Sequence, residues 1–291
     1  MDRASLRHSL HAVRKLAEAI VLRTATPQEM HVELDRLRAS ARYADARCLV
    51  PFGQKVYAQT DEDGILREIF RRIGLTTRTF VEFGVGNGLE NNTLALLFEG
   101  WTGLWIEGSA AHVHALEAGF ATTLASGRLK ARQAMITREN IDALIAADMP
   151  HGPIDLLSVD IDGNDYHVFE AIRCIDPRVV VIEYNAKFAP PIEYCMVYDP
   201  AHRWQRDDCF GASLSFLEKA FARRGYALVG CNVAGANAFF VRAGLVGDLF
   251  DRPFTAEHHY EPARYHLAGA PSGHPASYRA LERAMPGAPI R

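Results

Sequence analysis

The sequence predicts a doubly wound α/β protein whose mostly parallel sheet ends in an antiparallel hairpin. Five short runs are apolar on both faces, which is typical of parallel strands covered by helices on both sides. Helical patterns separate these runs, so each strand reaches the next one through a helix. Two further runs lie close together near the end of this region, as the strands of a hairpin do.

The expected strands cover residues 79–83, 102–106, 129–134, 154–160, 179–184, 226–231 and 238–241. Helices are expected between them at 92–99, 111–120, 138–147, 165–172 and 213–224, and one more precedes them at 61–73. Apolar residues recur at steps of three and four over residues 5–22 and predict an amphipathic helix. Thr26 as a cap and Pro27 at the first helical position predict a second helix that runs to about residue 42.

These elements divide the chain into three parts. Residues 1–50 form an N-terminal helical extension, residues 51–245 the main domain, and residues 246–291 a C-terminal arm with a short helix at 277–284. Three placements are open for the N-terminal helices: they pack on the body of the protein, form a homodimer contact or touch a membrane surface. The sequence does not distinguish between the first two. The arm is a candidate lid over a substrate.

Composition excludes several classes of protein. The 291 residues include 32 Lys and Arg and 35 Asp and Glu, a balance that argues against nucleic acid as the main partner. The five cysteines are scattered, so neither a disulfide framework nor a zinc site is expected. No apolar run approaches the roughly 18 residues of a membrane span, and the N-terminus lacks the apolar core of a signal peptide. We therefore expect a cytoplasmic protein with no membrane partner.

A glycine-rich loop follows the first expected strand. Gly84, Gly86 and Gly88 come at alternate positions after Glu82. Such a loop lets a ligand approach the backbone, and the helix after it offers N–H groups to an anion. Dinucleotide-binding loops read Gly-x-Gly-x-x-Gly/Ala, but Leu89 stands here where the last small residue would be. The spacing therefore favours S-adenosylmethionine over NAD.

An acidic residue, Glu107, ends the second expected strand, and Gly108 and Ser109 follow it. A carboxylate at this strand tip can accept both hydrogen bonds of a ribose diol. The glycine loop and this acid together indicate a nucleoside-binding site much more strongly than either alone.

With these motifs, the chain resembles the class I S-adenosylmethionine-dependent methyltransferases, and among them the FkbM-like group. The resemblance covers roughly residues 57–241, and it also rests on a Gln-x-x-Glu-Asp-Gly-Ile pattern from Gln59 and on residues 154–163. It implies a Rossmann-like methyltransferase fold in which the glycine loop holds the methionine part of the cofactor and the strand-tip acid holds the ribose. The implied cofactor-binding residues are Gln59, Glu82, Gly84, Gly86, Gly88, Asn92, Glu107, Gly108, Ser109, Ile136, Thr137 and Asp160.

Oxygen-bearing side chains end the fourth and fifth expected strands. Asp160 and Asp162 lie two apart and point to the same side, as do Glu183 and Asn185. Oxygen ligands at this edge of the sheet suit Mg²⁺ or another hard cation, and the resemblance adds that metal-dependent O-methyltransferases use acids and an asparagine there. In the alternative, Asp160 hydrogen-bonds the cofactor or substrate and Asp162 stabilises a turn at Gly163, or the charges only cap or coat the surface.

Catalysis of methyl transfer requires an acceptor held in line with the methyl group and made electron-rich by a cation or a base. The candidate catalytic residues are Asp160 and His167, although a histidine one turn into a helix is more typical of a packed side chain. The sequence from Asp160 to Asn164 also resembles the nucleophile motif of haloacid-dehalogenase-type phosphatases. That family carries the motif on its first strand, with Thr or Val in place of Asn164.

The acceptor is expected to contact later parts of the chain. The resemblance implies Tyr184, Asn232 and Asn237. The arm offers a cluster that either closes over a polar or anionic acceptor or lies on an uninvolved surface: His258, His259, Tyr260, Arg264, Tyr265 and His266. The sequence therefore predicts methylation of a hydroxyl on a small molecule such as a sugar or a secondary metabolite, with or without Mg²⁺. An NAD-dependent oxidoreductase and a non-catalytic scaffold on the same fold are the alternatives.

Overall fold

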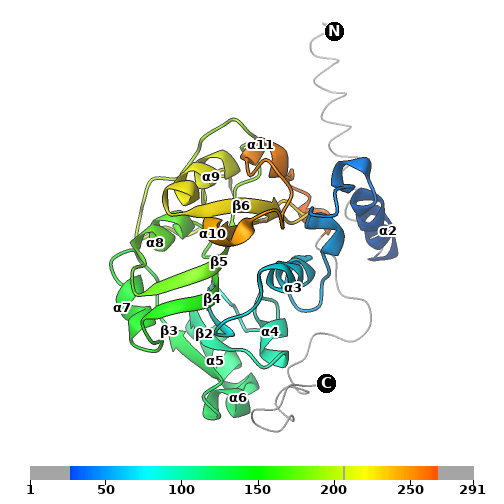
Figure 1. The fold of residues 1–291 in the computed structure, drawn as a ribbon. Coiled ribbons are helices and arrows are strands. Elements are labelled where there is room, and N and C mark those ends of the chain that lie inside the picture. Colours follow the sequence, from blue (N-terminus) through cyan, green and yellow to red (C-terminus); the bar gives the residue numbers. More distant parts are fainter. Residues whose placement is uncertain (1–26, 206, 268–291) are drawn as a thin grey trace, which may run out of the picture.

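One sheet lies at the centre of the protein, which we describe from a computed structural model of residues 27–205 and 207–267 (Figure 1). Its strands are β1 (Thr79–Phe83), β2 (Thr102–Glu107), β3 (Leu129–Gln133), β4 (Gly152–Val159), β5 (Ile175–Glu183), β6 (Tyr226–Cys231) and β7 (Asn237–Arg242). Their order is β3-β2-β1-β4-β5-β7-β6. Strands β1 to β5 are parallel, whereas β7 is antiparallel to both β5 and β6. The predicted doubly wound sheet with an antiparallel end is confirmed.

Helices cover both faces of this sheet (Figure 1). The α-helices are α2 (Pro27–Arg38), α3 (Glu62–Ile73), α4 (Leu94–Phe98), α5 (Ala110–Gly119), α6 (Ala121–Ala125), α7 (Ile141–Ala146), α8 (Asp165–Ala171), α9 (Leu214–Arg223), α10 (Ala243–Val246) and α11 (Ala256–His259). Three 3₁₀ turns are η1 (Ala41–Tyr43), η2 (Val50–Phe52) and η3 (Tyr265–Leu267).

Alternation along each strand divides the apolar side chains between two cores. In β5, Val179 and Val181 pack in the core that holds α3, α4 and α5, whereas Val180 and Ile182 pack in the core of α7, α8 and α9. Burial on both faces explains why the strands read as continuous apolar runs in the sequence.

The sheet brings four strand ends to one edge. Phe83 of β1 is in register with Ile106 of β2 and Val159 of β4. Glu183, at the end of β5, is paired with Asn237, at the start of the antiparallel β7. The loops after β1, β2, β4 and β5 therefore meet at the carboxyl edge of the sheet, where open α/β folds place ligands.

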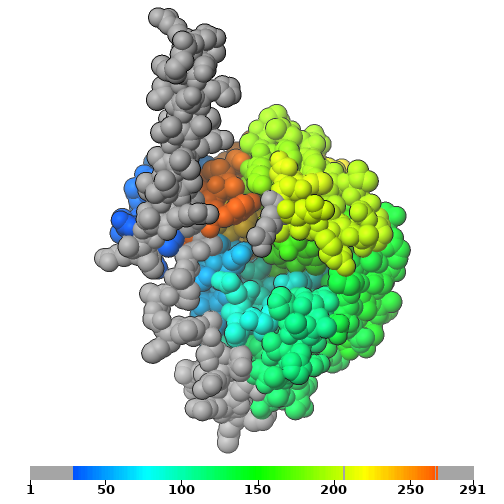
Figure 2. Space-filling model, turned by 180° about the vertical axis from the view of Figure 1, so that it is seen from behind, coloured from blue at the N-terminus to red at the C-terminus, as the bar shows by residue number. Residues whose placement is uncertain are grey.

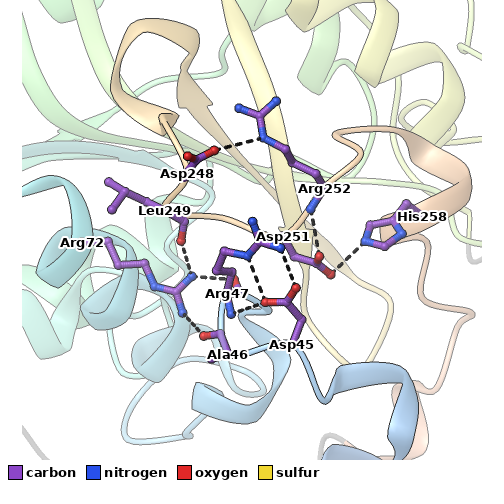
Figure 3. A network of polar contacts seen from close by, with 9 residues as sticks. All are labelled: Asp45, Ala46, Arg47, Arg72, Asp248, Leu249, Asp251, Arg252 and His258. Atoms are coloured by element: carbon purple, nitrogen blue, oxygen red, sulfur yellow. Dashed lines mark hydrogen bonds and ion pairs between the residues drawn. The ribbon is translucent and has the colours of Figure 1, made fainter.

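The arm after β7 returns to the N-terminal segment beside α3. Arg72 of α3 donates to the main-chain oxygens of Arg47 and Leu249 at 2.5 and 2.8 Å (Figure 3). The Asp251 carboxylate lies 2.8 Å from the His258 ring nitrogen in the same network. These contacts tie the segment near residue 47 and the start of the arm to one helix.

The observed bounds differ little from the predicted ones. β1 and β6 have the predicted bounds, β4 and β5 begin earlier, at Gly152 and Ile175, and α2 ends at Arg38. The helices predicted at 5–22 and 277–284 lie outside the described residues. All five cysteines are unpaired. Within residues 27–205 and 207–267, no helix combines the length and apolar character needed to cross a membrane.

Candidate active site

A cavity of about 860 Å³, the central cavity, opens at the carboxyl edge of the sheet. Loops after β1, β2 and β3 form its loop side, and the connection after β5 forms the opposite side because β4 and β5 lie beyond β1 in the sheet. In Figure 2 the yellow-green and orange segments lie above the cyan and green ones. The predicted residues that line the cavity are Gln59, Glu82, Gly84, Gly86, Asn92, Glu107, Gly108, Ser109, Ile136, Asp160, Asp162, Glu183 and Asn237.

The three glycines of the loop after β1 have different environments. A Cβ on Gly84 would lie 1.7 Å from the main-chain oxygen of Asp160, so this glycine allows β1 and β4 to approach each other. Gly86 has φ +55°, and a Cβ there would meet no atom within 4 Å. Gly88 does not line the cavity, because it is packed under the rings of Trp105 and Phe120. Of the three, Gly86 leaves open space for a ligand, and the expected ligand contact of Gly88 is corrected to a packing role.

The carboxylate of Glu82, a residue of β1, binds the segment that starts the helix after the loop. Its carboxylate accepts hydrogen bonds from the Asn92 N–H at 2.9 Å, the Thr93 hydroxyl at 2.5 Å and the Ser158 hydroxyl at 3.1 Å. Burial raises the pKa of Glu82 to about 7, although these hydrogen bonds act in the opposite direction. Asn91 Oδ1 accepts the N–H groups of Thr93 and, at 2.8 Å, Leu94. The N–H groups of Asn92, Thr93 and Leu94, which lead into α4, are therefore already bound by side-chain oxygens.

Glu107 joins the loops after β1 and β2. One carboxylate oxygen accepts the Gly86 N–H and the other accepts the Ser109 N–H, each at 2.8 Å. Each oxygen keeps a second lone pair, and the residue lines the cavity. A rigidly held carboxylate at this position can accept two hydrogen bonds from a ligand diol.

Asn91 and Met135 also contribute to the loop side of the cavity. Asn91 is 6% exposed, lines the cavity, and its Nδ2 has no hydrogen-bond partner among the described residues. Met135 is 50% exposed and its sulfur lies against Gly108. Thr137, predicted beside Ile136, does not line the cavity, and its N–H donates to the Asn140 side chain.

Three carboxylates form an acid cluster at the ends of β4 and β5. Asp160, Asp162 and Glu183 each offer an oxygen within 4.8 Å of the other two. Burial and the neighbouring carboxylates of Asp165 and Asp162 raise the pKa of Asp160 well above its usual range. Burial and Asp160 do the same to the pKa of Glu183, whose Oε2 is buried and has no hydrogen-bond partner in the described part of the chain.

The fourth predicted ligand, Asn185, does not line the cavity. Its amide donates to the main-chain oxygens of Asp208 and Phe210 at 2.9 and 3.1 Å, so it positions the connection after β5. The turn below the cluster is held by Asp165, which the sequence did not single out. Its carboxylate accepts the N–H groups of Ile161 and Gly163 on either side of Asp162, whose φ is +54°.

The position of His167 does not support its predicted role as the catalytic base. Its Nε2 lies 2.8 Å from the main-chain oxygen of Met196, and the residue does not line the cavity. α8 directs this side chain away from the strand ends. His202 lies in the cavity instead, with its ring so close to Gly163 that a Cβ there would be 2.4 Å from a ring carbon. Its Nε2 is buried and has no hydrogen-bond partner within the described residues.

The acceptor residues predicted in the hairpin are mainly structural. Asn232 does not line the cavity and donates to the Thr60 hydroxyl and the Glu62 carboxylate at 2.6 and 2.8 Å. Asn237 lines the cavity and also donates to Glu62, at 2.9 Å. Tyr184 is fully buried, with its hydroxyl bound to the main-chain oxygen of Glu261. These residues fasten α3 and the arm to the sheet.

Three of the predicted arm residues, His259, Tyr260 and Arg264, do not line the central cavity. Tyr260 donates to the Ala186 oxygen at 2.6 Å and Arg264 donates to the Val233 oxygen at 2.7 Å. His259 is buried, and burial lowers its pKa to about 4. The arm packs on the hairpin, and among its described residues the predicted Tyr265 lines the cavity.

We name the side opposite the loops the outer wall. It consists of Lys187, Pro200, His202, Arg203, Trp204, Phe210 and Tyr265. Of these residues the sequence singled out only Tyr265; the others lie in the irregular connection after β5, which carries no periodic pattern.

Comparison with known proteins adds solved structures only. No protein-family model matches the chain, and no curated protein matches it. A provisionally named caffeoyl-CoA O-methyltransferase from Staphylococcus aureus is 14% identical, with a TM-score of 0.44 over 72% of this chain and 96% of that one. The EvdMO1 N-terminal domain with SAH bound is 12% identical, with a TM-score of 0.41 over 75% and 95%.

The glycopeptide N-methyltransferase MtfA, in complex with S-adenosyl-L-homocysteine, is 16% identical, with a TM-score of 0.39 over 75% of this chain and 98% of that one. Similarity of this size identifies neither a cofactor nor a substrate for this chain. The FkbM-like assignment remains a prediction.

Proposed function

We propose that the protein is an S-adenosylmethionine-dependent methyltransferase that methylates a hydroxyl of a small molecule. One juxtaposition carries the proposal: Glu107 offers its carboxylate to a diol, while the N–H groups of Asn92, Thr93 and Leu94 at the nearby helix start are bound by Glu82 and Asn91 rather than left for a phosphate. In dinucleotide enzymes the pyrophosphate sits on the N-terminus of this helix. Here Glu82 and Asn91 fill that position, which favours a nucleoside ligand without phosphates.

The loop side fits the parts of such a cofactor. Glu107 accepts hydrogen bonds from the ribose diol, and Gly86 leaves the space beside it open. Asn91 Nδ2, a buried donor with no hydrogen-bond partner among the described residues, suits the cofactor's amino-acid carboxylate. Met135 offers an exposed apolar surface to the adenine, beside Gly108.

The acid cluster fits a hard divalent cation such as Mg²⁺. Such an ion prefers oxygen ligands, and three carboxylate oxygens lie here within 4.8 Å of one another. The Oε2 atom of Glu183 is buried and has no hydrogen-bond partner among the described residues. Asp160, Asp162 and Glu183 would hold it. When bound, a cation lowers the pKa of a coordinated hydroxyl and so supplies the nucleophile.

The remaining step is removal of the acceptor proton. His202 Nε2 is buried in the cavity and its ring lies against the turn that carries Asp162. It can accept a proton from a hydroxyl held at the acid cluster. Transfer then requires only that the acceptor oxygen lie in line with the methyl group, which the two sides of the cavity arrange by holding each reactant separately.

Calorimetric titration tests this proposal. Purified protein is titrated with S-adenosylmethionine, S-adenosylhomocysteine and NAD, with Mg²⁺ present or chelated. Binding of both sulfur ligands and none of NAD supports a methyltransferase. Binding of NAD alone would favour an oxidoreductase, and binding of none by folded protein would favour a scaffold.

A further inference from the structure

The outer wall carries two positive charges that form no ion pair with any other described residue. Lys187 and Arg203 are exposed side chains that line the central cavity. Within the described residues neither forms an ion pair, and the Arg203 side chain donates a hydrogen bond to the main-chain oxygen of His202. The acid cluster therefore neutralises neither of the two cations.

Lys55, on the loop side of the cavity, differs from these two cations. Lys55 stands beside the same cavity, but its Nζ lies 3.0 Å from the carboxylate of the cavity residue Glu90 and 2.7 Å from the main-chain oxygen of Gln59. A cation on the loop side is thus paired within the protein. Among the described residues that line the cavity, the cations without an ion pair, Lys187 and Arg203, both belong to the outer wall.

Aromatic rings stand beside these cations. Trp204 is 45% exposed, although its indole N–H is held by the Asp207 oxygen at 2.9 Å and its ring packs against Phe210. Tyr265 is 42% exposed at the same cavity. A fixed, half-exposed tryptophan and an exposed tyrosine at a cavity provide flat apolar surface for a planar ligand.

We propose that the outer wall is an acceptor subsite for a flat, hydroxylated ring that carries an anionic group, with Lys187 and Arg203 binding the anion and Trp204 packing on the ring. This inference rests on the proposed function in one respect: the hydroxyl of the ring points at the acid cluster and is the group that is methylated. The anion recognition itself does not depend on it. An aromatic ring meets the requirement for a flat face with its π surface, and a sugar ring meets it with the patch of C–H groups on one face of its chair.

Trp204 provides a readout that needs no turnover. The chain has three tryptophans. Trp101 and Trp105 are 2% and 0% exposed, so a ligand on the outer wall should change the emission of Trp204 and leave the other two unaffected. A Trp204→Phe variant should abolish the response.

Two matched pairs of probes separate the two ring types: 4-hydroxybenzoate with its methyl ester, and methyl β-D-glucuronide with methyl β-D-glucoside. Each is titrated while Trp204 emission is followed. The anionic member of at least one pair should bind about 10-fold more tightly than its neutral partner, because two partly exposed ion pairs are worth about this much together. The pair that responds identifies the ring type. The preference should shrink in about 0.5 M salt.

Variants test the residues. The double variant Lys187→Gln/Arg203→Gln should bind both members of the responding pair within about twofold of each other, while Lys219→Gln, an exposed lysine of α9 paired with Glu193, should keep the preference. Equal binding of both members in both pairs, or no change in Trp204 emission with any of the four probes, would overturn the proposal. Titration of the same samples with S-adenosylhomocysteine reports separately on the proposed function.

Discussion

The loop side and the outer wall of the central cavity are built in opposite ways. On the loop side the polar side chains are fixed by the protein: Glu82 and Glu107 each accept hydrogen bonds from several groups. On the outer wall, Lys187 and Arg203 have no ion pair within the described residues, and Trp204 is half exposed. The difference suggests that the loop side holds a ligand of one fixed shape, whereas the outer wall selects its ligand by charge.

The acid cluster lies where the two sides meet, and changes there should have the largest effect. Asp160→Asn should lower the turnover rate about 100-fold or more, because it removes assistance in deprotonating the acceptor. Affinity for S-adenosylhomocysteine should change by less than about threefold. A merely structural loss would instead lower both the turnover rate and this affinity. Asp248→Asn, on an exposed residue of the α10–α11 connection, is the control. Full activity of Asp160→Asn after chelation would remove the cluster from the mechanism.

Glu107→Ala should impair ligand binding on the loop side and leave binding on the outer wall unchanged. Loss of two charge-assisted hydrogen bonds predicts an affinity for S-adenosylhomocysteine that is about 10- to 100-fold weaker, with no change in the binding of probes to Trp204. Glu117→Ala, an exposed acid on α5 that does not line the cavity, should bind normally. Equal affinities in the two variants would show that the ribose lies elsewhere.

Glycine substitutions sharpen the comparison further. Gly86 and Gly127 both have positive φ and open space around a Cβ, but only Gly86 lines the cavity. Gly86→Leu and Gly127→Leu should each lose about 1–2 kcal/mol of stability from backbone strain. Only Gly86→Leu should weaken S-adenosylhomocysteine binding, by about tenfold. Thermal unfolding and calorimetry on both variants measure the two effects, and equal affinities would contradict the assigned space.

The smallest expected effect is on stability. The pKa of Glu82 rises from 4.5 to about 7 in the folded protein, so the folded state binds this proton more tightly than the unfolded state. Stability should therefore fall as the pH rises through about 7. Glu82 alone predicts a loss of about 1 kcal/mol between about pH 6.5 and 8 in chelated protein. Denaturant unfolding at the two pH values measures it, and greater stability at pH 8 would refute the burial effect.

The sheet could be predicted from sequence because burial on both faces leaves a direct record in the chain. The loop side could be predicted as well, since residues that follow parallel strands must meet at one edge. Gly88 was misjudged because sequence spacing does not show that two rings, those of Trp105 and Phe120, pack over it. His167 was wrong because the turn held by Asp165 orients α8 away from the strand ends.

Most of the outer wall could not be predicted. His202 and Trp204 lie in the long connection between β5 and α9, where no periodic pattern records what each side chain faces. Tyr265 reaches the cavity only because the arm folds back over the hairpin, a contact between segments far apart in the sequence. Asn91 was missed although it stands beside the predicted Asn92, because only the structure shows which of the two amides has an unpaired donor.

The most direct test of the assigned site is a crystal structure of the protein grown with S-adenosylhomocysteine. The predicted result places the ribose hydroxyls within hydrogen-bonding distance of the Glu107 carboxylate, the amino-acid carboxylate at Asn91, and the sulfur toward Asp160. A ligand bound outside the central cavity, or one whose ribose lies on the outer wall, would contradict the assignment of the two sides.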